Sequence, residues 1–307
     1  QMSIAAATVF LAVTTAVTCA LPGVFLVLRR QSMLVDAMSH AVLPGVVIGA
    51  IVSGTTHSPW MIAAASAMGM IVVLGSEWLR RTGLIARGAD QGLIFPALFA
   101  GGVILLSTSL KSVHICEDTV LTGDLNLMAL PSEHVLVRGV NLGPQTALML
   151  LGVFAVTAIF IACTYRVLSL ATFDPVLART MGLPVRTVDY TLMALVAVTV
   201  VVAFNAAGAI LVVALVVVPP AVAVLFGNRL PVVIALSLVI AVISAVAGFW
   251  TAYVLDLPTA PLMAAVSGVL LVSAVAFVKI RSRARAKVRS SGRAAVSMSA
   301  GSALSGR

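Results

Sequence analysis

The feature that most constrains this chain is its series of long segments without charge. Residues 4–28 hold no charged side chain, and a helix needs only about 20 apolar residues to cross a bilayer. Of the 307 residues, 61% are hydrophobic and 9% are charged, whereas a soluble domain carries about a quarter charged residues. This small number of charges cannot cover the surface of a globular protein in water. The chain is therefore predicted to be an integral membrane protein.

Uncharged or nearly uncharged runs recur along the chain and predict an all-α bundle of about nine transmembrane helices. In lipid, backbone polar groups must bond within their own segment, which favours helices, and the sequence lacks the alternation of a membrane barrel. Only the residues Asn-Ala-Ala-Gly at 205–208 separate two of the runs, so eight spans is the alternative. The predicted spans are 4–28, 33–53, 59–79, 91–110, 145–165, 187–204, 206–227, 231–254 and 258–278.

The distribution of basic residues predicts the orientation of these spans. With the N-terminus outside and the C-terminus cytoplasmic, only Lys111 and Arg138 of the 19 lysines and arginines fall outside, which agrees with the positive-inside rule. The net charge of +9 comes largely from a basic stretch directly after the last apolar run. That position suits contact with anionic lipid, so no nucleic-acid partner is expected.

The same patterns divide the chain into two parts. Residues 1–281 are predicted to form one transmembrane domain, with an external loop at 111–144 and a cytoplasmic segment at 173–184. Residues 282–307 are rich in Ser, Ala, Gly and Arg and show no apolar periodicity. They are predicted to be a disordered cytoplasmic tail.

Asp36 and His40 are candidate metal ligands, because they are ionisable and lie inside or at the edge of an apolar span. Their spacing of four places them on one helix face, and a carboxylate at membrane depth by default faces a cavity or a partner. Carboxylate oxygen and imidazole nitrogen suit Mn(II), Fe(II) or Zn(II). A second chain would have to complete the site; the alternative is a helix cap beside a structural histidine. Pro44 and Gly45 are predicted to break this helix and line a transport path.

The cytoplasmic segment that begins at Phe173 predicts a short helix. Asp174 can cap its N-terminus and Pro175 suits its first turn, while Gly182 provides a left-handed stop. Such a helix is either an ordinary loop element or a surface presented to a cytoplasmic partner.

No enzymatic function is predicted. The sequence contains no HExxH motif of zinc proteases, and none of its three lysines, Lys111, Lys279 and Lys287, lies in a Walker A motif. If the chain works in an ATP-driven process, another polypeptide must hydrolyse the ATP.

Four stretches resemble the metal-ion permease subunits of bacterial ATP-binding-cassette importers for manganese, zinc and iron. Residues 28–49 (LRRQSMLVDAMSHAVLPGVVIG) are similar to the second-helix signature of that family, and 114–125 (HICEDTVLTGDL) to its external loop. Residues 173–182 (FDPVLARTMG) resemble its coupling segment, and 208–226 (GAILVVALVVVPPAVAVLF) its late helix. Cys116 stands where the family more often has Asp, so the cluster His114, Glu117 and Asp118 receives no role.

The resemblance implies a multi-pass subunit in the bacterial plasma membrane that carries a divalent transition metal as substrate and holds no permanent cofactor. It implies metal contact at Asp36 and His40, with equivalents from a second permease subunit, identical or paralogous. It makes Phe173, Asp174, Pro175 and Gly182 part of the element that enters a groove on cytoplasmic ATPase subunits, and it implies an extracellular metal-binding lipoprotein as donor. The alternative hypothesis is a secondary metal/proton transporter with Asp36 as proton relay.

Overall fold

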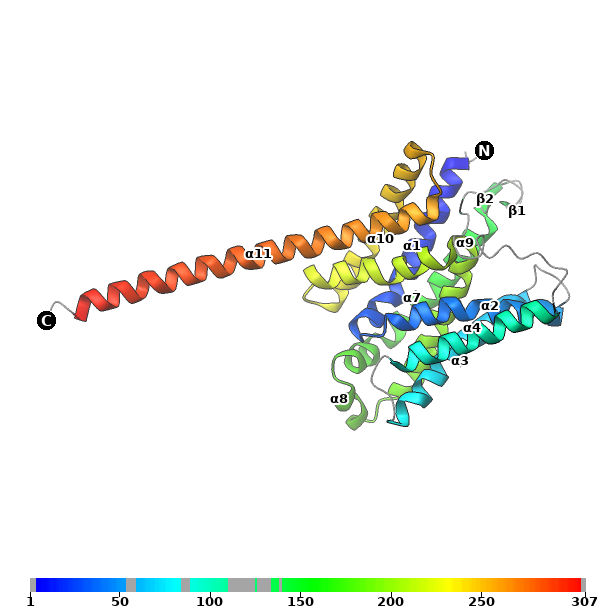
Figure 1. Cartoon of the computed structure of the whole chain (residues 1–307), viewed down its shortest axis with the longest axis horizontal. Coiled ribbons are helices and arrows are strands. Elements are labelled where there is room, and N and C mark those ends of the chain that lie inside the picture. Colours follow the sequence, from blue (N-terminus) through cyan, green and yellow to red (C-terminus); the bar gives the residue numbers. More distant parts are fainter. Residues whose placement is uncertain are drawn as a thin grey trace.

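The computed structural model describes residues 4–53, 59–83, 89–109, 125, 134–137 and 140–304 (Figure 1). This part of the chain is a bundle of helices with one small hairpin. The helices are α1 (Ile4–Leu28), α2 (Met33–Ser53), α3 (Pro59–Arg81), α4 (Ala89–Ser109), α7 (Gln145–Phe173), α8 (Pro175–Thr180), α9 (Val185–Phe226), α10 (Leu230–Leu255) and α11 (Thr259–Leu304).

Six helices in the described part are long and apolar enough to cross a membrane. They are α1, α3, α7, α9, α10 and the Thr259–Arg281 part of α11. Helices α2 and α4 carry shorter apolar stretches, Met33–Gly49 and Gly92–Leu105. Each span predicted from the sequence falls on a helix, or on part of one, to within a few residues.

Helix α9 is broken near its middle. Its 42 residues are about twice what one bilayer crossing needs. Gly208 has φ 73° and ψ 167°, a backbone conformation that is essentially restricted to glycine. The second half of α9 leaves the first in a new direction there (Figure 1). The break lies at the end of the short stretch that separates two predicted spans.

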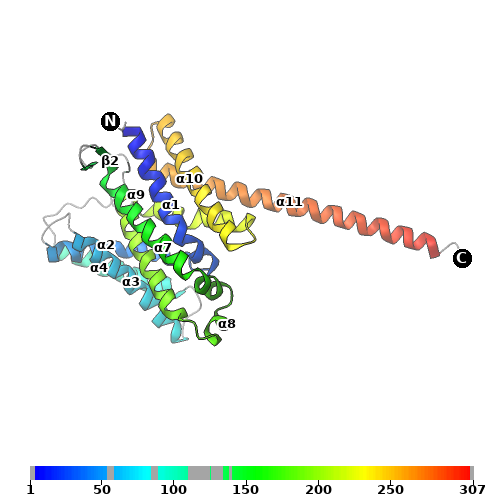
Figure 2. The ribbon, with the colours of Figure 1, turned by 180° about the vertical axis from the view of Figure 1, so that it is seen from behind.

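Helix α1 lies at the centre of the bundle, in contact with α7, α9 and α10 (Figure 2). Its Leu11, Phe25 and Leu26 are among the largest fully buried side chains. A Cβ on Gly23 would collide with the backbone of Val216 in α9. Glycine at this position therefore lets the two helices approach closely, as small residues do in membrane bundles.

Helices α2, α3 and α4 pack together beside this core (Figure 1). Gly45 and Gly49 of α2 face α3, and a Cβ on either would overlap the backbone of Ala65 or Met61. The spacing of four brings both glycines to one face of α2, an arrangement that allows close contact between helices in lipid.

The predicted break in α2 at Pro44 and Gly45 is wrong. The helix is continuous over Met33–Ser53, and both residues are buried. Proline removes one backbone hydrogen bond from a helix, but neighbouring helices stabilise such a helix in a membrane bundle. Here α4 supplies that support, since a Cβ on its Gly102 would lie 2.6 Å from the Pro44 Cβ. In this structure the two residues serve helix packing.

The predicted external loop holds an antiparallel hairpin of β1 (His134–Val137) and β2 (Val140–Pro144). The all-α prediction missed it. The β1 sequence His-Val-Leu-Val carries β-branched residues that favour a strand. The cluster His114, Glu117 and Asp118 lies outside the described residues.

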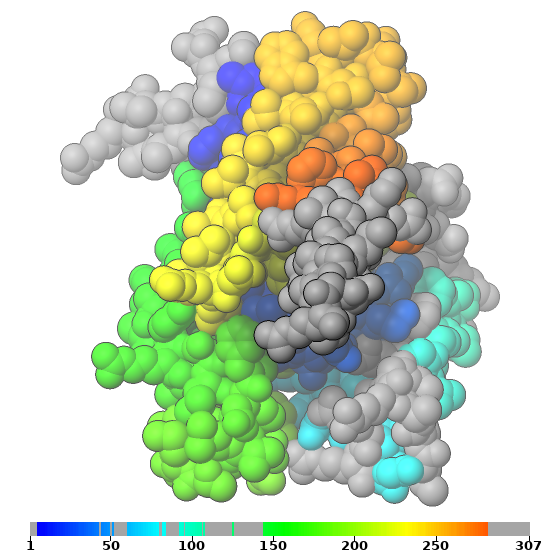
Figure 3. Space-filling model, turned by 90° about the vertical axis from the view of Figure 1, so that its left-hand side faces the viewer, coloured from blue at the N-terminus to red at the C-terminus, as the bar shows by residue number. Residues whose placement is uncertain are grey.

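Helix α11 extends far beyond the bundle and reaches Leu304 (Figures 1 and 2). The backbone of residues 282–304 thus continues the helix, and the predicted disorder of the free tail stays a prediction. These residues include many Ala and Arg, which favour helix, and they extend an existing helix without the cost of a new nucleus. Seen from the side on which α11 projects, the gold and yellow residues of α10 lie in the upper part of the bundle and the green residues of α7 and α8 at the lower left (Figure 3).

Candidate metal and coupling sites

Asp36 and His40 lie in the first two turns of α2 and face the same side of the helix. The His40 Nε2 atom is 3.6 Å from the Asp36 Oδ1 atom. The side chain of His40 is 28% exposed and that of Asp36 is 56% exposed, so the carboxylate is open to a further partner. The two predicted metal ligands are thus brought together, as the spacing of four requires.

Neighbouring helices fix the orientation of this pair. Val35, Met38 and Ser39 of α2 are buried in the core, which turns the opposite face, with the pair, away from it. The His40 ring meets the Phe99 ring of α4 edge to face, with centroids 6.1 Å apart and an interplanar angle of 84°. This arrangement suits aromatic rings and holds the imidazole beside α4.

The pair supplies one carboxylate and one imidazole. Among the described residues, no group of three or more His, Cys, Asp or Glu side chains could hold a metal ion. Protein metal sites for transition metals usually have three or four ligands from the chain. A metal bound at Asp36 and His40 therefore needs ligands from outside the described part of this chain.

The segment 173–184, predicted to be cytoplasmic, has the backbone that its sequence predicts. Helix α8 begins after Asp174, whose Oδ1 atom accepts a hydrogen bond of 2.9 Å from the Leu177 backbone N–H. Pro175 occupies the first turn, and Gly182 has φ 73° after the helix ends. Local capping chemistry alone therefore specifies the start and the end of this helix.

Sequence reasoning missed the apolar surface that this segment presents. Phe173, Val176, Leu177 and Met181 are all exposed, Val176 by 71%. On the other side of α8, Ala178 is completely buried and packs with Ala171 and Val185. The sequence did carry a signal for this surface, namely large apolar side chains in a short loop between two predicted spans. Such a cluster, when exposed, usually marks a contact with another protein or a membrane.

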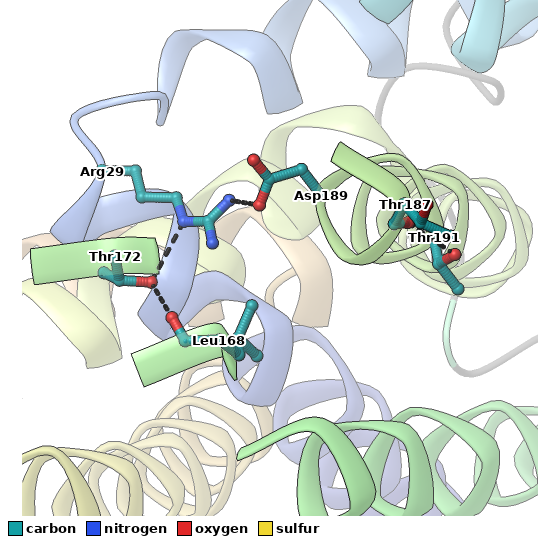
Figure 4. A network of polar contacts seen from close by, with 6 residues as sticks. All are labelled: Arg29, Leu168, Thr172, Thr187, Asp189 and Thr191. Atoms are coloured by element: carbon teal, nitrogen blue, oxygen red, sulfur yellow. Dashed lines mark hydrogen bonds and ion pairs between the residues drawn. The ribbon is translucent and has the colours of Figure 1, made fainter. Parts of the chain in front are cut away.

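Sequence reasoning also missed an ion pair beside α8. The Arg29 Nη1 atom donates to the Asp189 Oδ1 atom of α9 at 2.7 Å, and its Nε atom donates to the Thr172 Oγ1 atom of α7 at 3.1 Å (Figure 4). Arg29 had counted only as one of the basic residues that set the orientation. The available signal was Asp189 itself, because an acidic residue at the start of an apolar span indicates a basic partner.

These sites belong to a fold with known relatives. The sequence model of the ABC 3 transport family matches residues 1–278.

The chain belongs to the ABC 3 transport family.

Two curated relatives of this ABC 3 family member span most of its length. It is 38% identical over 265 residues to the manganese transport system membrane protein MntD of Bacillus subtilis, an alignment that covers 86% of this chain and 89% of the relative. It is 37% identical over 262 residues to the zinc transport system membrane protein TroD of Treponema pallidum, covering 85% and 71%. The resemblance to metal-permease subunits of ABC importers is therefore confirmed.

A solved structure shares the fold. The family member has a TM-score of 0.71 with a chain of PsaBC from Streptococcus pneumoniae, solved in complex with Fab, at 24% identity. The match covers 87% of this chain and 89% of the solved chain. This chain therefore shares the arrangement of its helices with that PsaBC chain.

Proposed function

We propose that this chain is the membrane-spanning permease subunit of an ABC importer that moves Mn(II), Zn(II) or Fe(II) into the cytoplasm. The Asp36–His40 pair carries the proposal: an oxygen and a nitrogen donor lie 3.6 Å apart on an exposed helix face. Those donors suit the three metals. Family membership supplies the transport context.

The metal site is proposed to be shared between two permease subunits. Each subunit, identical or paralogous, contributes one carboxylate and one imidazole, which together give four ligands. The exposure of Asp36 leaves it accessible for such a contact. Transport requires binding that is strong enough to admit the ion and weak enough to release it, so we expect modest affinity.

The proposed topology has nine spans, with the N-terminus outside and the tail in the cytoplasm of a bacterial cell. Division of α9 at Gly208 gives two helices of residues 185–207 and 209–226, each about as long as a bilayer core is thick. On a background without the native cysteines, a membrane-impermeant reagent added outside should label Ser132→Cys and spare Thr180→Cys in α8. The reverse pattern would overturn this topology.

Energy is proposed to come from separate ATPase subunits that bind α8 and its exposed apolar side chains. The geometry favours this, because an apolar surface on a short cytoplasmic helix needs a protein partner to cover it. An extracellular metal-binding lipoprotein is the proposed donor of the ion.

Reconstitution distinguishes this function from a secondary metal/proton transporter. Proteoliposomes that contain the chain with its ATPase and permease partners should take up radioactive Mn(II) or Zn(II) only when ATP reaches the ATPase. Vesicles that contain the chain alone should take up no metal under a pH gradient. Uptake by the chain alone would instead support the secondary transporter with Asp36 as proton relay.

A further inference from the structure

The side chain of Arg29 bridges three helices next to α8. It extends from the corner between α1 and α2, and its guanidinium bonds α7 through Thr172 and α9 through Asp189 (Figure 4). Thr172 and Asp189 lie 143 and 160 residues after Arg29, and the Arg29 side chain is only 11% exposed. Resting on the proposed function, we infer that Arg29 is a positioning residue that transmits movement of the coupling helix α8 to the metal pair on α2.

The first step is that Arg29 holds both connections of α8. Thr172 lies two residues before Asp174, the cap of α8, and its hydroxyl also donates to the Leu168 carbonyl oxygen at 2.7 Å. Asp189 lies in the first two turns of α9, directly after the segment. A displacement of α8 therefore pulls on the guanidinium from two sides.

The second step is that α8 moves together with these connections. Ala178 of α8 is fully buried against Ala171 of α7 and Val185 of α9. The Leu183 backbone N–H donates to the Ala178 carbonyl oxygen at 3.3 Å, which closes the turn after the helix. Closely packed groups shift as a unit instead of deforming continuously.

The third step is that the corner carrying Arg29 is stiff and short. The Arg29 backbone N–H donates to the Phe25 carbonyl oxygen at 3.0 Å, and that of Gln31 donates to the Leu26 carbonyl oxygen at 2.8 Å. Helix α2 begins only a few residues later, and Asp36 lies in its first turn. A shift of Arg29 is thus passed to Asp36 through the short connection between α1 and α2 and the first turn of α2.

The chemistry of the side chain fits this task. A guanidinium is a planar fork that bonds two partners in fixed directions, which the single ammonium group of lysine cannot reproduce. The Nη2 atom of Arg29 is buried and makes no hydrogen bond to any described residue. One donor group is thus available for a new acceptor when α7 and α9 change position.

If Arg29 only held the helices together, its removal would change the amount of assembled complex and nothing else. If Arg29 is a positioning residue, its removal also changes the number of metal ions transported per ATP hydrolysed. This ratio should be measured in proteoliposomes with the complete complex, for the wild type and for Arg29→Gln, Asp189→Asn and Thr172→Val. Arg186→Gln is the matched control, because it removes an exposed positive charge from the same end of α9.

We expect Arg29→Gln to lower the ratio at least about fivefold, the low end of typical coupling between sites. Arg29→Lys and the two partner variants should lower it less, and Arg186→Gln should leave it unchanged. An unchanged ratio in Arg29→Gln, or uptake and ATP hydrolysis that fall together, would overturn the inference.

If Arg29→Gln does not assemble, Asp189→Asn and Thr172→Val decide the question, because each removes one bond only. A lowered ratio in these two variants supports the inference, and a wild-type ratio overturns it. Failure of the wild-type complex to show ATP-dependent uptake would instead contradict the proposed function itself, whatever the Arg29 variants do.

Discussion

The Asp36–His40 pair on α2 and helix α8 are the two proposed functional sites. They differ in how many of the residues that each site needs are found in the described part of this chain. Helix α8 is structurally complete: its cap, its buried contact and its terminating glycine all lie within a few residues of one another. The proposed metal site is incomplete within the described residues, because Asp36 and His40 offer only two donors there, on a half-exposed face. The comparison teaches that a short sequence can specify a helix fully, whereas one chain can specify only part of a site that, as proposed, two subunits share.

The largest effect is expected at the incomplete site. Asp36→Asn keeps the shape of the side chain and removes its charge, and His40→Leu removes the nitrogen donor. Either should reduce ATP-dependent uptake of radioactive Mn(II) or Zn(II) to the level without ATP, because too few ligands are left for the ion. The amount of assembled complex should stay the same.

Asp256→Asn is a suitable control for that loss. It removes a carboxylate from the end of α10, at a residue with φ 52°, which asparagine tolerates well. Normal uptake by both Asp36→Asn and His40→Leu would show that the pair is a structural cap and no metal site.

The next largest effect should concern the exposed face of α8. Val176→Glu places a charge in a contact proposed to be apolar, which should weaken ATPase binding by about 3 kcal/mol, as for other unpaired buried charges. Co-purification of the ATPase with the permease measures it. Val176→Leu keeps the apolar character and should bind normally. Equal ATPase binding by Val176→Glu would place the contact elsewhere.

A smaller effect is expected where α8 ends. Valine at position 182 would have to adopt the φ of 73° now held by glycine, which costs about 1–2 kcal/mol for a residue with a side chain. Gly182→Val should therefore uncouple ATP hydrolysis from uptake while membrane insertion stays normal. Gly182→Asn tolerates the left-handed conformation and should behave nearly as wild type. Wild-type transport by Gly182→Val would reduce the segment to an ordinary loop.

The smallest effect is expected at the cap of α8. Asp174→Ala removes the 2.9 Å bond to Leu177 and should cost the short helix about 1 kcal/mol. Uptake should fall partly, while Asp174→Ser should restore it, since serine also caps helices. Full uptake by Asp174→Ala would show that the form of α8 does not depend on this cap.

The structural features that depend on residues close together in the sequence could be predicted from it. The spans could be located because lipid requires long uncharged helices, and α8 because Asp174 and Gly182 are local signals. The break at Pro44 was wrong because packing of α2 on α3 and α4 outweighs one lost hydrogen bond.

Contacts between distant residues could not be predicted in this way. Arg29 bonds partners 143 and 160 residues further along the chain, and no local pattern encodes such pairs. The apolar face of α8 was visible in the sequence only as composition, because exposure depends on how the segment packs against α7 and α9.

The number of metal ions bound per complex tests the central claim most directly. The detergent-purified complex, free of nucleotide and saturated with Mn(II), should bind one ion for each pair of permease subunits at the α2 face. Asp36→Asn in this chain should abolish that binding. Binding of one ion to each permease chain independently, or binding unchanged by Asp36→Asn, would contradict a site shared between two subunits.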